Sequence, residues 1–400
     1  MFAVLSAARK RLRLPRLARS AAAALGLVAL AACDPIQIGG LAGGGGGSGP
    51  RIDTSQPVPV ALLIPKSDAG AGAVARSLEN AARLAVADLG TVKIDLRVYD
   101  TAGNAATAAA QAQKAVDAGA KIILGPLFGE AANAVGVQVA DDNVNVLSFS
   151  NNPSIAGGNV FILGPTFRNT ANRLMGYAAA KGKKSVTIVH PNNVEGQFGK
   201  VAIEAAAGSS GIRVVSSEGF DFSQAGVVAA MPRIAAAAKQ SDTVFLTSNA
   251  AGALPLLVQL LPENGIGPDS TQYIGLARWD VPPQTLALPG LQGGWFAMPD
   301  QSRIASFNSR YQGAYGSAPH PLAGLAFDGI AAIGALVGAG KSDALTAGAL
   351  TQTAGFQGSG GVFRLRADGT NERALAVAAV RGNKVVILDP APNRFGSAGF

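Results

Sequence analysis

Few side chains in this sequence belong to the types that form catalytic or metal-binding sets. The chain has two histidines, His190 and His320, and one cysteine, Cys33. They lie far apart in sequence, and Cys33 directly follows an apolar segment, so we predict neither a Cys/His catalytic pair nor a Cys/His metal cluster. The sequence also contains no Gly-x-Ser-x-Gly motif. We therefore expect a protein that is not an enzyme and that holds no metal or cofactor.

The polar side chains that could bind a small molecule follow predicted strands. Serine hydroxyls and asparagine amides form hydrogen bonds without filling a site. Arg278 and Asp280 could bind the two charged ends of a zwitterion, or could equally face solvent. Asn151 could bind a ligand, or could belong to a turn whose side chains bond the local backbone. The candidates of this kind are Ser148, Ser150, Asn151, Asn192, Asn193, Asn249, Arg278 and Asp280.

Short apolar runs that alternate with segments of helical length position these side chains. The first four runs cover residues 60–65, 94–100, 122–126 and 144–148, and a second series of the same kind covers residues 185–275. This alternation predicts parallel strands joined by helices. Ligands bind at the carboxyl ends of the strands in such sheets. The sequence thus predicts an α/β fold with two Rossmann-like lobes and a cleft between them.

The positive charge of the chain is concentrated at its N-terminus. The formal net charge is +8, and six of the 33 basic residues precede Ala21 with no acidic residue among them. Without those six, 27 basic residues face 25 acidic ones. A nearly neutral mature protein gives little support to nucleic-acid binding.

The same N-terminal segment has the pattern of an export signal. The apolar run of residues 21–30 is too short for a permanent membrane span and is typical of a secretory signal. The sequence Leu30-Ala31-Ala32-Cys33 resembles a bacterial lipobox, in which the cysteine is acylated and becomes the mature N-terminus. We expect a periplasmic protein that lipidated Cys33 anchors to the inner or the outer membrane. The alternative is an ordinary signal peptide, with Cys33 incidental.

The predicted domain division follows from these patterns. Residues after the second series are too few for a third domain, so we expect the chain to cross back several times and to form a multi-strand hinge. The division assigns 1–32 to the signal peptide, 33–56 to the lipidated cysteine and a glycine-rich tether, 57–166 and about 297–355 to lobe 1, 167–296 and about 356–390 to lobe 2, and 391–400 to a tail.

Two parallel lobes, repeated crossings and an export signal resemble the type 1 periplasmic-binding-protein fold. The segments VYDTAGN (98–104), GAKIILGPLF (119–128), FSNN (149–152) and PNN (191–193) are similar to the LppC-type lipoproteins, called penicillin-binding-protein activators. This resemblance implies a non-catalytic lipoprotein that binds a bifunctional penicillin-binding protein and stimulates peptidoglycan synthesis in the cell wall. The well-studied enteric members carry a helical-repeat domain before this fold, whereas this sequence has a glycine-rich tether in that place.

The fold supports a second hypothesis, the solute receptor of an ABC importer for an amino acid, an amide or a similar small solute. Amino-acid receptors of this fold hold the ligand carboxylate with hydroxyl and main-chain N–H groups after the fourth strand, where Ser148 and Ser150 lie. They also place an aromatic residue after the first strand of the second lobe, and Phe198 is the nearest candidate. The partner would then be an ABC permease, with a small polar ligand in the cleft.

Overall fold

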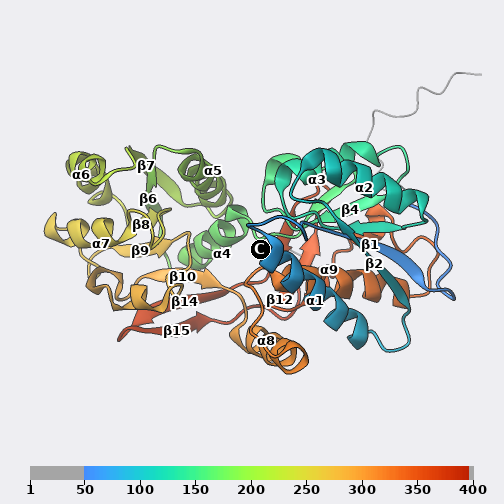
Figure 1. The fold of residues 1–400 in the computed structure, drawn as a ribbon. Helices are drawn as coiled ribbons and strands as arrows, with labels where there is room; N and C mark the ends of the chain where they lie inside the picture. The colour runs from blue at the N-terminus through green and yellow to red at the C-terminus, as the bar shows by residue number, and fades with distance from the viewer. Residues whose placement is uncertain (1–48, 396–400) are drawn as a thin grey trace, which may run out of the picture. The chain divides into compact units, whose positions relative to one another are not determined.

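The computed structural model describes residues 49–395 (Figure 1). Cys33, the predicted signal peptide and most of the predicted tether lie outside the described residues. The α/β class is confirmed, with a five-stranded sheet, a seven-stranded sheet and a small three-stranded sheet. Within residues 49–395, no helix combines the length and the hydrophobicity needed to cross a membrane.

The sheet of the first lobe is parallel throughout and has the order β2-β1-β3-β4-β5. Successive residues of a strand point to opposite faces, so both faces need a cover. Val60, Leu62 and Ile64 pack with α1 and α9, whereas Ala61 and Leu63 pack with α2 and α3. The elements are β1 (Val58–Ile64), α1 (Gly72–Asp88), β2 (Ile94–Asp100), α2 (Ala105–Asp117), β3 (Ile122–Leu124), α3 (Gly129–Gln138), β4 (Asn145–Ser148), β5 (Val160–Ile162) and α9 (Ala323–Gly338).

The sheet of the second lobe is mixed and has the order β15-β14-β10-β9-β8-β6-β7. Strands β6 to β10 are parallel, while β14 and β15 form an antiparallel edge. Tyr273 and Phe296 pack with α6 and α7, and Ile274 and Trp295 pack with α4 and α5. The elements are α4 (Phe167–Ala180), β6 (Ser185–Pro191), α5 (Val194–Ser209), β7 (Arg213–Phe220), α6 (Gln224–Ala238), β8 (Thr243–Leu246), α7 (Leu254–Glu263), β9 (Gln272–Gly275), β10 (Trp295–Met298), β14 (Ala376–Arg381) and β15 (Lys384–Asp389).

Three connections join the lobes. The chain passes from β5 to α4, from β10 to α8 (Gln301–Tyr315), and from β13 (Asn371–Arg373) to β14. The first and third connections are bonded together: Arg373 Nη2 donates to Leu163 O at 2.6 Å, and Asn371 Nδ2 donates to Gly164 O at 2.8 Å. These two crossing segments therefore form one bonded unit at the junction of the lobes.

The structure corrects the predicted division of the C-terminal part. Residues 356–373 were expected in lobe 2, but Phe356 and Phe363 are buried in the lobe 1 core beside α9. They belong to β11 (Phe356–Gly358) and β12 (Gly361–Leu365), which with β13 form the three-stranded sheet. Such a small sheet needs a partner surface for its apolar face. The predicted tail also begins within the fold, because Ala391 is buried in the lobe 2 core.

The predicted tether likewise ends earlier than expected. Ile52 is 7% exposed and belongs to the lobe 1 core, and its backbone N–H donates to Ser342 O at 2.9 Å. Ser342 lies shortly before the helix α10 (Ala347–Leu350). Burial of an isoleucine side chain stabilises a fold by about 1.5–3 kcal/mol, so residues near Ile52 are part of the globular unit.

Candidate functional site

A cavity of about 710 Å³ lies between the two lobes, where the crossing segments meet. Its walls come from all three crossings, from α8 and the start of α9 in the first lobe, and from the loops after β8 and β9 in the second. Five prolines with fixed backbone φ line it: Pro165, Pro282, Pro299, Pro319 and Pro321. Phe307, Leu322, Leu325 and Val281 add apolar surface. Both lobes therefore contribute to one largely apolar site.

Arg278 and Asn249 are the two sequence-predicted candidates that line this cavity. Arg278 lies beside Trp279, which is fully buried, and a Cβ at Gly275 would lie only 2.3 Å from the Trp279 ring. The tight contact between glycine and tryptophan fixes the backbone of the loop after β9. Arg278 Nε donates to Asp280 Oδ1 at 3.0 Å. The two charged side chains thus bond each other instead of standing free for the two ends of a zwitterion.

The hydroxyl groups of the candidates at the end of β4 bond nearby backbone groups. The buried Ser148 Oγ donates to Pro126 O at 3.0 Å and accepts from Ser150 N at 3.1 Å. Ser150 Oγ in turn accepts from Asn152 N at 3.1 Å. Asn151 is exposed, and none of these side chains lines the inter-lobe cavity. Short hydroxyl side chains readily bond nearby backbone groups, and a ligand would have to compete with those bonds.

The candidates after β6 are also held locally. Asn193 caps α5, since its Oδ1 accepts from Gly196 N at 2.8 Å. Asn192 Nδ2 donates to Asp221 Oδ1 at 3.3 Å. Phe198 is half exposed on the second turn of α5. None of the three lines the cavity.

Sequence reasoning missed a buried ion pair in the cavity wall. Asp328, only 1% exposed, accepts from Arg373 Nη1 at 2.9 Å and from Ser359 N and Oγ at 2.6 and 2.8 Å. Arg373 also lies over the Phe363 ring, 5.1 Å from its centre. Burial of a charge requires such partners. The sequence feature that could have indicated this ion pair is Asp328 itself, the single charged residue in the apolar helix α9.

Asp300 lies next to the cavity-lining Pro299 and begins α8. Its Oδ1 accepts from Ser302 N at 2.9 Å and from Arg303 N at 3.2 Å. The hydrogen bond from the Ser302 hydroxyl is the main cause that holds the pKa of this carboxyl below its ordinary value. Asp300 is thereby a negatively charged helix cap, which is favourable at a helix N-terminus. Among the described residues, no group of acidic, histidine or cysteine side chains is arranged to hold a metal ion.

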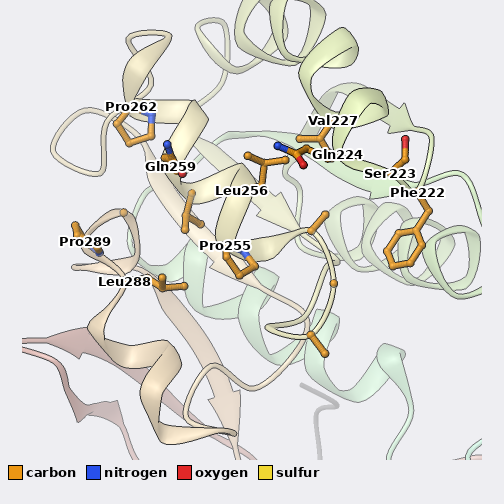
Figure 2. Close-up of a pocket in the computed structure, with 15 residues that line it drawn as sticks. Phe222, Ser223, Gln224, Val227, Pro255, Leu256, Gln259, Pro262, Leu288 and Pro289 are labelled. Carbon is orange, nitrogen blue, oxygen red and sulfur yellow. The ribbon is translucent and has the colours of Figure 1, made fainter.

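A second hollow, of about 910 Å³, lies within the second lobe (Figure 2). Phe222 and Val227 stand on one side of it, and Leu256, Leu288 and Pro289 on the other. Its polar side chains are uncharged, and no residue of the first lobe lines it. It therefore lacks both the charge and the two-lobe enclosure of the inter-lobe cavity.

Comparison with known proteins identifies the family. The family model described as "Periplasmic binding protein" matches residues 57–384. The chain belongs to this family. It is accordingly a periplasmic binding protein and not an enzyme. No curated protein matches the sequence.

Solved structures share the fold of this periplasmic binding protein. A putative branched-chain amino acid ABC transporter protein from Rhodospirillum rubrum superposes with a TM-score of 0.70 at 19% identity, over 83% of this chain and 100% of the other. A branched-chain amino acid ABC transporter ligand-binding protein from Burkholderia xenovorans gives 0.64 at 18% identity, over 83% and 96%. The LivJ substrate-binding protein of Streptococcus pneumoniae, in complex with isoleucine, gives 0.54 at 17% identity, over 84% and 100%.

These findings overturn the interpretation as an activator of a penicillin-binding protein. The match of the periplasmic-binding-protein family model over most of the chain, together with ABC transporter proteins as structural neighbours, contradicts that hypothesis. The short segments behind this resemblance lie at strand ends and turns of the shared fold, for example residues 98–104 at the end of β2 and 149–152 after β4. Turn geometry favours similar residues in such places whatever the protein binds.

Proposed function

We propose that this protein is the solute-binding receptor of an ABC importer and that its solute binds in the inter-lobe cavity. The observation that carries the proposal is the 710 Å³ cavity, which both lobes and all three crossings line. This volume lies in the usual range of small-molecule sites, about 300–1,000 Å³. A solute that contacts both lobes at once stabilises them against each other, and a permease can respond to that change.

The proposal includes a membrane anchor at Cys33 and an ABC permease as the partner. Two or three acyl chains on one cysteine hold a protein at a membrane surface, because each buried methylene contributes about 0.8 kcal/mol. A glycine-rich tether lets the receptor reach its permease while it stays at the membrane. Cys33→Ser should move the protein from the membrane fraction to the soluble fraction, and retention in the membrane fraction would contradict the anchor.

Thermal unfolding in the presence of solutes tests the receptor function. The described residues, 49–395, belong to one compact unit, so a protein that starts at Gly45 retains all of them, with Ile52 in the core. A solute at a hundredfold excess over its Kd stabilises the folded protein by about 2.7 kcal/mol. We expect such a shift with at least one member of a broad panel of amino acids, amides and carboxylates.

Two variants decide which hollow binds the solute. Asn249→Ala changes the inter-lobe cavity, whereas Gln259→Ala changes the hollow of the second lobe. We expect the first variant to weaken the solute-dependent shift and the second to leave it intact. The opposite pattern, or a broad panel that gives no shift at all, would refute the proposed function.

A further inference from the structure

We propose that the inter-lobe cavity selects solutes with an apolar body and a single carboxylate, and that it rejects the corresponding α-amino acids. This inference rests on the proposed function and specifies its substrate class. It follows from how the charged side chains at the cavity are already paired. An amino acid needs a partner for its carboxylate and another for its ammonium group.

The acidic side chain of the cavity wall is not free to bind an ammonium group. Asp328 receives three hydrogen bonds, from Arg373 Nη1 at 2.9 Å and from Ser359 N and Oγ at 2.6 and 2.8 Å. Its side chain is 1% exposed. A solute ammonium could reach it only by displacing an arginine that also bonds Leu163 O. Such a displacement would leave a buried arginine unpaired.

Both carboxylate oxygens of Asp280 contact Arg278, and Arg278 has further N–H donors that Asp280 does not use. Its Oδ1 accepts from Arg278 Nε at 3.0 Å, and its Oδ2 forms an ion pair with Arg278 Nη2. Asp280 is 12% exposed and does not line the cavity, whereas Arg278 is 40% exposed and does. A guanidinium has five N–H donors, and no residue of the described chain accepts from Arg278 Nη1. Asp280 is therefore a positioning residue that orients Arg278 toward an acceptor group.

The remaining polar groups cannot balance a positive charge. Asn249 and Asn308 offer neutral amides, and His320 Nδ1 already accepts from Leu322 N at 3.2 Å. The other walls are mainly proline, leucine, valine and phenylalanine side chains. An ammonium group there would lose hydration without a charged partner, while a carboxylate would gain a charge-assisted bond from Arg278. The cavity thus offers one anion-binding point beside an apolar wall.

Matched pairs of solutes test this selectivity by titration calorimetry on the protein that starts at Gly45. The pairs are 4-methylpentanoate with leucine and 3-phenylpropanoate with phenylalanine, which differ only in the α-amino group. We expect the carboxylate of at least one pair to bind at least about tenfold more tightly than its amino acid. Arg278→Gln should weaken that carboxylate by about tenfold or more. Arg310→Gln, on the exposed face of α8, should leave its affinity unchanged.

The outcomes separate this inference from the proposed function. Tighter binding of leucine or phenylalanine than of the matched carboxylates would overturn the inference and leave the receptor function standing. Equal carboxylate affinity in the wild type and in Arg278→Gln would also overturn it, because the anion would then be held elsewhere. Failure of all four solutes, while another solute of the broad panel binds, would overturn the substrate class alone. Failure of the whole panel would overturn both proposals.

Discussion

Replacing Asp328 with asparagine should destabilise the protein by about 3–5 kcal/mol, because it leaves Arg373 as an unpaired charge in the wall of the cavity. The N–O distance of the pair is 2.9 Å, and the two side chains are 1% and 12% exposed. At an effective dielectric constant of about 20, two unit charges at this distance attract by about 6 kcal/mol. Desolvation of both charges offsets part of this attraction, so the pair contributes less net stability than the attraction alone. Removal of one partner costs more than that net contribution, because the other charge is left desolvated and unpaired.

A double-mutant cycle isolates the interaction. Asp328→Asn, Arg373→Met and the double variant should be unfolded in urea at pH 7, with the free energy of unfolding taken from each transition. We expect a coupling energy of at least about 1.5 kcal/mol, and a double variant that is less damaged than the sum of the single variants. Arg310→Met provides the control, since its pair with Asp88 has side chains 44% and 41% exposed and should contribute under about 1 kcal/mol. A loss below about 1 kcal/mol for Asp328→Asn would refute the reasoning.

Four further predictions concern the stability of the fold. Gly275→Ala should cost about 1–3 kcal/mol in urea unfolding, because the new Cβ would meet the buried Trp279 ring. Gly176→Ala in α4, where a Cβ meets nothing within 4 Å, should instead stabilise the protein by about 0.5–1 kcal/mol. Ile52→Ala should cost about 2–4 kcal/mol, and a neutral result would show that residues before β1 are not part of the core. Asp242 accepts hydrogen bonds from two backbone N–H groups, chiefly that of Lys184, which lower its pKa below the ordinary 3.8. The unfolded state therefore takes up the proton first, so the stability that Asp242 contributes is complete above about pH 5 and is lost as the pH falls below 3.8. The difference in stability between the wild type and Asp242→Asn should shrink over this range, and a constant difference would contradict the assignment.

The sequence predicted the site less well than the fold. Of the nine cleft candidates, Asn249 and Arg278 line the inter-lobe cavity. Ser148 and Ser150 are of suitable chemistry, but their hydroxyls bond backbone groups of their own turn and of the loop after β3. Competition between a ligand and a neighbouring backbone group depends on exact turn geometry, which residue types do not specify.

The function was also harder to predict from the sequence than the fold. The strand-end segments that resembled penicillin-binding-protein activators belong to a fold that serves different functions, and the family match contradicted that hypothesis. A fold is specified by many distributed apolar contacts, whereas a function depends on a few side chains in one place. The charge pairing of Arg278 and Asp280 illustrates this difference, because two residues separated by one position could have faced a ligand, solvent or each other.

The sequence by itself determined the elements and the layers of this protein. Alternating apolar runs such as residues 58–64 and amphipathic alanine-rich segments encode strands and helices locally, through side-chain periodicity. Only the tertiary structure decided that β11 and β12 complete the first lobe, that Asp328 meets Arg373, and that residues from all three crossings surround one cavity. Those contacts join residues tens to hundreds of positions apart, so they depend on how the lobes pack and are not contained in any local pattern.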